Sequence, residues 1–329
     1  MRATSTALHA FLLLVASLVL GSLLNAHGLR RTALVQPPGV RRDVALALTK
    51  PLVQVSDALY LDRPRAGLKG ALGRSADDRV DTTIALPVVH AVRPPKHVTH
   101  HRRVVTTRPS FTATHPLRVW IAGDSLAEVP GEALERKAGT GGTLDIVGLE
   151  SRLDTGLTRP DLYNWFTRLP QVVSGLKPRA AVLFFGADDE HSYMSGVPAG
   201  RTLGPLGSAS WDAEYRRRVD AITQELVDSG TYVVWVGLPI TRGGGYRFGF
   251  RTVNHILEAA VGSEPGKATY VDTWRLFLDN HGKYADYLPN AHGRLLLMRA
   301  PDGVHYEPAA GDLIAERVLA RLHAVFDLR

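Results

Sequence analysis

The sequence of 329 residues contains no cysteine and only one long apolar run. The absence of cysteine excludes a disulfide scaffold, a thiolate metal site and a cysteine nucleophile. It also fits an oxidising compartment, without proving one. A single apolar run excludes a protein that crosses a membrane several times. The chain is 45% hydrophobic and 22% charged, which excludes wholesale disorder and leaves room for one large domain or two modest ones.

Positive charge is concentrated in the N-terminal third of the chain. Residues 1–115 contain 16 Lys and Arg against 6 Asp and Glu, a net +10, so residues 116–329 hold 39 − 16 = 23 basic and 32 − 6 = 26 acidic residues, a net −3. The C-terminal part therefore offers no excess positive charge to nucleic acid, and we expect no nucleic-acid partner. A basic segment beside an apolar one favours contact with anionic lipid head groups or an anionic envelope polymer.

The apolar run lies near the N-terminus and is long enough to span a membrane. A cleaved signal peptide needs small residues at positions −3 and −1 of the cut. Cleavage after Ala26 places Leu24 at −3, and cleavage after Gly21 places Val19 there, and neither is a good match. We therefore expect an uncleaved anchor; cleavage would instead make the protein secreted.

This anchor, residues 1–30, contacts the membrane through residues 7–27. The flanking arginines alone place the large domain inside the cell. Long domains often cross regardless of flanking charge, and the chemistry described below favours a position outside the cytoplasm. We expect a single-pass protein with its large domain extracytoplasmic.

Residues 31–115 connect the anchor to the rest of the chain. Apolar positions in 44–72, interrupted by prolines, fit one or two short helices near the membrane, or a partly ordered linker. Residues 75–115 combine prolines and histidines with no periodicity, which is typical of a flexible tether. The histidine cluster at 97–101 is interpreted as solvated rather than as a metal site, and no metal or cofactor is expected.

Short apolar runs alternate with helical patterns from Leu117 onward. The runs that read as buried strands are Val119–Ala122, Leu144–Val147, Ala180–Phe185, Tyr232–Val236 and Ala268–Val271. Helical patterns lie near 127–138, 160–175, 211–228, 252–262 and 309–325. This alternation predicts an α/β domain over 116–329, with a parallel sheet covered on both faces. Ligands of such sheets bind beyond the carboxyl ends of the strands.

Two motifs carry the residues of a nucleophilic site. The first strand runs directly into Gly-Asp-Ser-Leu at 123–126, which exposes the hydroxyl of Ser125 at the sheet edge before a helix. A serine nucleophile needs a base, and Asp302 and His305 stand three residues apart before the last helix. The carboxylate can accept from one imidazole nitrogen while the other takes the proton of Ser125. Each motif alone is weak, but together they predict a Ser–His–Asp site.

With these motifs the sequence resembles the SGNH (GDSL-type) hydrolase superfamily, and it looks most like its bacterial membrane-tethered branch. The resemblance covers about 115–329. It implies a flavodoxin-like α/β/α sandwich and ester hydrolysis without a metal, with Ser125 as nucleophile. It also implies an oxyanion hole formed by the backbone N–H groups of Ser125 and Gly156, and it places Asp188 in a third contributing position.

Asp188 departs from the pattern of the family, which usually has an asparagine that donates to the oxyanion there. An ionised carboxylate repels an oxyanion, and losing one donor costs about 10²–10³ in rate. Three explanations are compatible with the sequence. Asp188 is protonated because neighbouring carboxylates raise its pKa, or it points away from the site, or the enzyme is weak or inactive.

Two further features of the sequence have competing interpretations. The three glycines at 243–245 form a loop that closes over substrate or a plain surface loop. The acidic run 188–191 offers ligands for a cation, but consecutive residues rarely all face one ion. The aromatic residues Trp165 and Phe166 are expected in the core.

The leading hypothesis is a serine esterase that removes or transfers an acyl group, such as O-acetyl, on an envelope glycan or lipid. Ser125 attacks, His305 moves the proton and Asp302 orients His305. Hydrolysis and acyl transfer use the same residues, so the sequence leaves both open. The alternative is a degenerate module of the same fold that binds an envelope glycan or a partner protein. No particular protein partner is indicated.

Overall fold

The computed structural model describes residues 2–71, 80–84 and 108–329. Two compact units are present, Met1–Asp81 and Thr82–Arg329. Most of the expected tether, including the histidine cluster at 97–101, lies outside the described residues.

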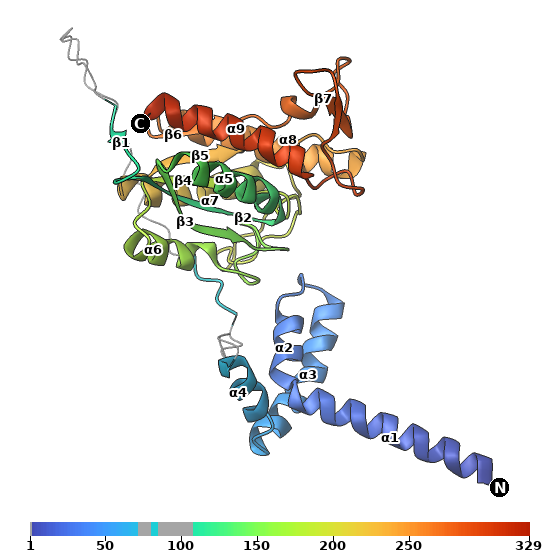
Figure 1. Ribbon diagram of the computed structural model, residues 1–329. Coiled ribbons are helices and arrows are strands. Elements are labelled where there is room, and N and C mark those ends of the chain that lie inside the picture. Colours follow the sequence, from blue (N-terminus) through green and yellow to red (C-terminus); the bar gives the residue numbers. More distant parts are fainter. Residues whose placement is uncertain (1, 72–79, 85–107) are drawn as a thin grey trace. The chain divides into compact units, whose positions relative to one another are not determined.

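The first unit is helical: α1 (Arg2–Leu24), α2 (Ala26–Leu34), α3 (Val40–Ala58) and α4 (Arg63–Ala71). The segment 44–72 is thus helical over most of its length. Helices α2 and α3 pack together, and the His27 ring lies 2.6 Å from the Asp57 carboxylate. The unit is coloured blue in Figure 1.

Helix α1 contains the stretch Ala7–Leu24, which is long and apolar enough to cross a membrane and is not buried within the protein. Its side chains are exposed around the helix; Leu12, Leu13 and Leu14 expose 54%, 69% and 58% of their surface. A helix that is apolar on all sides needs an apolar environment. The helix therefore suits either a membrane span or a signal sequence.

The second unit is built on a five-stranded parallel sheet in the order β3-β2-β4-β5-β6. The strands are β2 (Leu117–Gly123), β3 (Leu144–Ser151), β4 (Ala180–Phe184), β5 (Tyr232–Val236) and β6 (Ala268–Val271). The central strand β4 is buried throughout, as expected for a sheet covered on both faces. The predicted α/β sandwich and all five predicted strands are confirmed.

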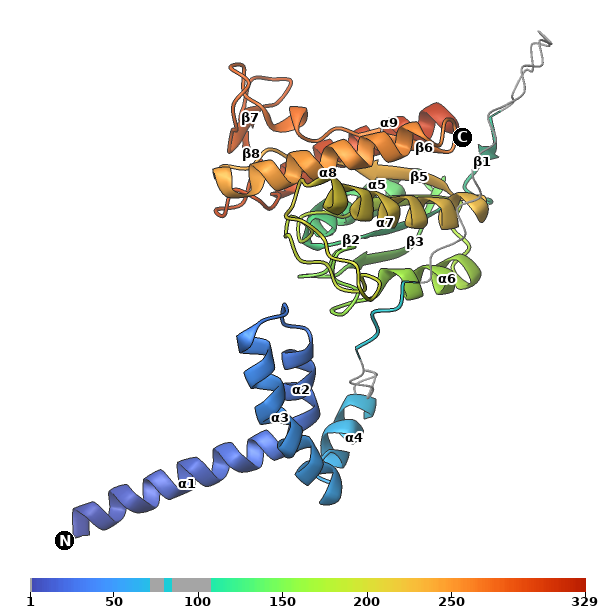
Figure 2. The same ribbon diagram turned by 180° about the vertical axis from the view of Figure 1, so that it is seen from behind.

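Helices cover both faces of this sheet. Helices α5 (Glu128–Gly141) and α9 (Pro308–Val325) pack together on one face, in front of the sheet in Figure 1. Helices α6 (Trp165–Gly175), α7 (Ala209–Asp228) and α8 (Gly244–Gly262) cover the other face, which is nearer the viewer in Figure 2. Trp165 and Phe166 are buried, in agreement with the sequence interpretation.

Other strands lie at the margins of the unit. Strand β1 (Ser110–Phe111) pairs in parallel with β9 (Asp327–Leu328), and the Phe111 ring packs edge-on against Phe326. Part of the segment interpreted as linker therefore packs on the C-terminus of the folded unit. An antiparallel hairpin, β7 (Tyr287–Pro289) with β8 (Leu295–Leu297), precedes the motif at 302–305. Its three-residue strands are too short to give a periodic signal.

The glycine run at 243–245 begins helix α8 instead of forming a loop as expected. Gly243 is the N-cap residue, and Gly244 and Gly245 are helical. The guanidinium of Arg247 donates to the carbonyls of Thr241 and Arg242, at 3.0 and 3.1 Å, which holds the first turn. Glycine has a low helical propensity. The sequence therefore predicts the part of α8 from 252 onward, which has a helical pattern, but not its glycine-rich first turn.

Candidate active site

The candidate nucleophile Ser125 stands where β2 ends, at the carboxyl edge of the sheet. A short 3₁₀ helix, Ser125–Ala127, turns the chain away immediately after the strand. Gly123 permits this turn to lie close to β4, because a Cβ at this position would collide with the backbone carbonyl of Phe184. The backbone thus brings Ser125 to the edge where parallel sheets bind ligands.

The structure brings the three predicted residues together in one hydrogen-bonded series. The Nε2 of His305 lies 2.8 Å from the Oγ of Ser125, and the Nδ1 of His305 lies 2.5 Å from an oxygen of Asp302. A carboxylate can only accept, so Nδ1 carries the proton and Nε2 is left to accept from Ser125. Ser125 and His305 are 180 residues apart in the sequence, so the fold brings them together.

The turn at Asp302 holds its carboxylate ionised. One oxygen accepts from the backbone N–H groups of Val304 and His305, at 2.8 and 3.0 Å, while the other faces the imidazole. Partial burial acts to raise the pKa of Asp302, but the hydrogen bonds from His305 and the backbone outweigh it and lower the pKa to about 2. The carboxylate is therefore charged at every pH where the protein would work, and it orients His305.

Asp124, within the first motif, joins two of the loops that surround Ser125. Its side chain is completely buried. One carboxylate oxygen accepts from the N–H of Leu126 at 3.0 Å, and the other from the N–H groups of Gly186 and Ala187 at 2.9 and 2.8 Å. This role of Asp124 could not be predicted from the motif, because it depends on backbone donors more than 60 residues away along the chain.

Asp189 performs a similar task on the other side of the candidate oxyanion hole. Its buried carboxylate accepts from the N–H groups of Leu157 and Thr158, from the hydroxyl of Thr158, and from the hydroxyl of Tyr215 at 2.8 Å. Gly156 must lack a side chain because a Cβ would collide with this carboxylate. The loop carrying Gly156 and the loop carrying Asp188 are therefore joined through Asp189.

A buried arginine on α7 also supports the loop that carries Gly156. Arg218 is fully buried and pairs with the buried Glu214 at 2.9 Å. Its two terminal nitrogens donate to the carbonyls of Leu157 and Ser195, at 2.7 and 2.8 Å. Sequence reasoning missed Arg218, because a helix carrying three consecutive arginines reads as a solvated surface until its buried face is known.

Asp188 lies between these anchors and is about half-buried. One of its oxygens is inaccessible to solvent and has no hydrogen-bond partner among the residues that the structure describes. Burial, and then the charges of Asp189 and Asp154, raise the pKa of Asp188 to about 6. The carboxyl is thus far easier to protonate than an ordinary aspartate, which is the first of the three alternatives drawn from the sequence.

The acidic run does not form a metal site among the described residues. No group of three or more histidine, aspartate or glutamate side chains there is arranged to hold an ion. The carboxylates of the run point to different partners: Asp189 binds the loop after Gly156, and Glu190 lies 3.7 Å from the ring of His191.

The family described as "Protein of unknown function (DUF459)" matches residues 118–321, which is more than half of the chain. The chain belongs to the DUF459 family. The match begins one residue after β2 starts and ends in α9, so this DUF459 region contains all of the five-stranded sheet except Leu117, and all three residues of the series. No curated protein matches the chain.

Solved structures similar to this DUF459 protein include a GDSL-like lipase and an esterase. A GDSL-like lipase from Bacteroides thetaiotaomicron is 13% identical, with a TM-score of 0.44 over 63% of this chain and 88% of that chain. The esterase EstA from a Pseudoalteromonas species is 15% identical, with a TM-score of 0.41 over 63% and 97% of the two chains. TesA is 17% identical, with a TM-score of 0.43 over 64% and 99%.

The predicted SGNH resemblance is confirmed for this DUF459 chain. Its parallel sheet, the serine after β2 and the Asp–His pair before the last helix are arranged as that resemblance implied. The arrangement supports chemistry of the hydrolase type.

Proposed function

We propose that the protein is a serine esterase that hydrolyses acyl esters, and that its substrate is an O-acylated glycan of the cell envelope. The observation that carries this proposal is the hydrogen-bonded series from Ser125 through His305 to Asp302. Such a series activates a hydroxyl at neutral pH because the imidazole removes its proton as the new bond forms.

The reaction divides into two half-reactions at Ser125. The Oγ attacks the ester carbonyl and its proton moves to Nε2 of His305. The tetrahedral intermediate then expels the alcohol, which takes that proton and leaves an acyl-serine. Water attacks the acyl-serine and gives a proton to His305, and when the acyl–Oγ bond breaks His305 returns that proton to Ser125 and the carboxylic acid leaves. If a sugar hydroxyl replaces the water, the same steps transfer the acyl group.

The negative oxygen of the intermediate needs donors close to Ser125. The backbone N–H groups of Ser125 and Gly156 are the proposed donors, and Asp188 is the third below about pH 6, where its carboxyl is protonated. Asp124 and Asp189 are positioning residues, because they fix the loops that carry these groups without touching the reacting atoms.

We place the esterase outside the cytoplasm, anchored by the stretch Ala7–Leu24. The basic segment that follows the anchor supports an anionic surface as its surroundings. An acylated envelope glycan is the substrate that such a position makes available, with a lipid ester as the next choice.

The test is hydrolysis of p-nitrophenyl acetate by the full chain in detergent micelles, beside the Ser125→Ala and His305→Gln variants. We expect turnover in the wild type and a loss of about 10³-fold or more in both variants. Glu316→Ala, an exposed change on α9, is the matched control and should retain activity. Turnover that persists in Ser125→Ala would refute the assignment of the nucleophile.

A second candidate, a binding module that has lost catalysis, is favoured by the carboxyl of Asp188 in the place of an amide. Reaction with a fluorophosphonate separates the two candidates. Labelling of Ser125 that requires His305 supports the esterase. A folded protein that is not labelled supports the binding module.

A further inference from the structure

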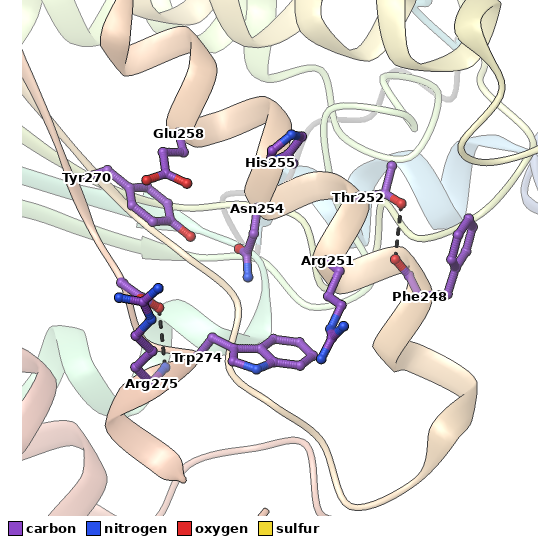
Figure 3. Close-up of a pocket in the computed structure, with 10 residues that line it drawn as sticks. Phe248, Arg251, Thr252, Asn254, His255, Glu258, Tyr270, Trp274 and Arg275 are labelled. Atoms are coloured by element: carbon purple, nitrogen blue, oxygen red, sulfur yellow. Dashed lines mark hydrogen bonds and ion pairs between the residues drawn. The ribbon is translucent and has the colours of Figure 1, made fainter. Parts of the chain in front are cut away.

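A second cavity lies between helix α8 and the segment after strand β6, and its lining contains no member of the Ser–His–Asp series. Its volume is about 590 Å³, within the range of about 300–1,000 Å³ that small-molecule sites occupy. Figure 3 shows its lining. The side chains on which the inference rests are Phe248, Arg251, His255, Glu258, Tyr270 and Trp274.

The wall formed by α8 presents three polar side chains in line. Arg251, His255 and Glu258 are separated by four and three residues, so they occupy one face of the helix. All three are exposed. Within the described part of the chain none of them hydrogen-bonds to another residue, so their donors and acceptors are available to a ligand.

The opposite wall is aromatic. The indole of Trp274 lies next to Arg251, whose guanidinium is 4.9 Å from the ring centroid, and the Tyr270 ring lies further along this wall, near Glu258 (Figure 3). The other four tryptophans of the protein are all fully buried in the core. Trp274 is only half-buried, so it is the one indole that a ligand can cover.

The charge and the aromatic side chains of the pocket indicate which class of ligand it can bind. Two arginines, Arg251 and Arg275, balance two carboxylates, Glu258 and Asp272, so the pocket has no net charge that would retain an ion. Its lining also includes the aromatic side chains of Phe248, Tyr270 and Trp274. A saccharide matches this lining because each hydroxyl both donates and accepts, while the C–H faces of its rings pack on aromatic side chains.

The pocket is connected to the Ser–His–Asp series through the start of α8. The backbone N–H of Arg242 donates to the carbonyl of Gly303 at 3.1 Å, inside the turn between Asp302 and His305. Phe248, at the rim of the pocket, lies one turn further along α8 than Gly244. The segment that leads into α8, whose later turns line the pocket, is therefore hydrogen-bonded to the turn that carries Asp302 and His305.

We propose that the pocket between α8 and β6 binds a neutral saccharide, as a holding site for the glycan whose ester is cleaved at Ser125. Binding at Trp274 is a property of the pocket alone, and only the link to cleavage rests on the proposed function. Binding energy gained at a remote site of this kind orients the reacting group and raises turnover.

The experiment follows the fluorescence of the full chain in detergent micelles as neutral tetrasaccharides are added: tetra-N-acetylchitotetraose, cellotetraose and maltotetraose. Since the other four indoles are buried, a saturable change in emission reports Trp274. We expect one of the three to bind, and Arg251→Ala to weaken it about tenfold. Arg317→Ala, also an exposed arginine on a helix, is the matched control and should leave the Kd unchanged.

Trp274→Phe should abolish the emission change and, by calorimetry, raise the Kd. Failure of all three saccharides to bind would overturn the proposal, as would binding that Arg251→Ala and Trp274→Phe both leave intact. Preference for tetragalacturonate would overturn the neutral assignment. Ser125→Ala should bind with unchanged Kd, so a wild type that binds saccharide but hydrolyses no ester would contradict the proposed function and leave the pocket assignment standing.

Discussion

Asp188 occupies the position in which the SGNH resemblance implies a neutral amide. Whether Asp188 stabilises the oxyanion depends on whether its carboxyl is neutral when the oxyanion forms. Burial and the charges of Asp189 and Asp154 raise its pKa to about 6. Below that pH the carboxyl is protonated and can donate, whereas above it the anion repels the negative oxygen of the intermediate.

The ratio of kcat/KM between Asp188→Asn and the wild type should therefore rise as the pH increases from 5 to 8. The amide is neutral throughout, while the carboxyl loses its proton near pH 6, so at pH 8 we expect a ratio of roughly 10–10². Taking the ratio cancels the titration of groups common to both proteins. A ratio that does not vary with pH would show that Asp188 does not face the oxyanion.

Asp124 is a second residue whose effect can be isolated. Asp124→Asn keeps the size of the side chain but replaces one accepting oxygen with a donor, so buried N–H groups lose their acceptor. The free energy of unfolding should fall by about 1–3 kcal/mol, and kcat should fall by about 10²-fold because the loops shift. Urea denaturation and p-nitrophenyl acetate turnover measure the two effects; reduced stability with normal kcat would confine Asp124 to a structural role.

At the scale of elements, the strands and most helices could be predicted from sequence because buried parallel strands are continuous apolar runs. Strand β4, for example, is fully buried, and its predicted limits differ from the observed ones by one residue. The catalytic candidates could be predicted because they lie in two short motifs, Ser125 in one and Asp302 and His305 in the other. The first turn of α8 could not, since glycine carries no periodic signal.

The supports of the site could not be predicted from sequence for a different reason. Asp189 and Arg218 act through partners that are 31 and 61 residues away along the chain, namely Thr158 and Leu157. Nothing in a local pattern distinguishes them from the solvated carboxylates and arginines around them. The role of Arg218 depends on which face of α7 is buried, and that of Asp189 on which loop lies against the end of β4.

Helix α7 offers a comparison between a buried and a surface arginine. Arg218→Met leaves the carbonyls of Leu157 and Ser195 and part of Glu214 without their donor, and should lower the free energy of unfolding by about 3–5 kcal/mol. Arg216→Met removes a partly exposed pair with Asp220 on the same helix and a hydrogen bond to the hydroxyl of Ser263, which together are worth about 1 kcal/mol. Urea denaturation should separate the two variants clearly. Similar losses in both would mean that the buried pair does not support the loop.

At the scale of the whole molecule, the N-terminal helix and the hydrolase-type unit contribute different properties. The stretch Ala7–Leu24 is apolar on every side, whereas the folded unit of the C-terminal part has a net charge of −3 over 116–329. The proposed function joins these two properties: an anchored esterase meets its substrate at a membrane surface, so its location would restrict the substrate together with the pocket.

If Ala7–Leu24 is a membrane anchor, as we propose, it determines how the protein behaves when it is expressed in bacteria. The full-length protein should remain in the membrane fraction after washing with alkaline carbonate, because about 18 apolar residues hold a helix in the bilayer. Leu14→Arg should release it, since a charge at the helix centre costs about 2.5–3.5 kcal/mol on insertion. Arg31→Ala, outside the apolar stretch, is the control that should stay bound. Protease added to spheroplasts should digest the folded unit if it lies outside the cytoplasm. A soluble, shortened chain with a new N-terminus after residue 21 or 26 would instead establish a cleaved signal peptide.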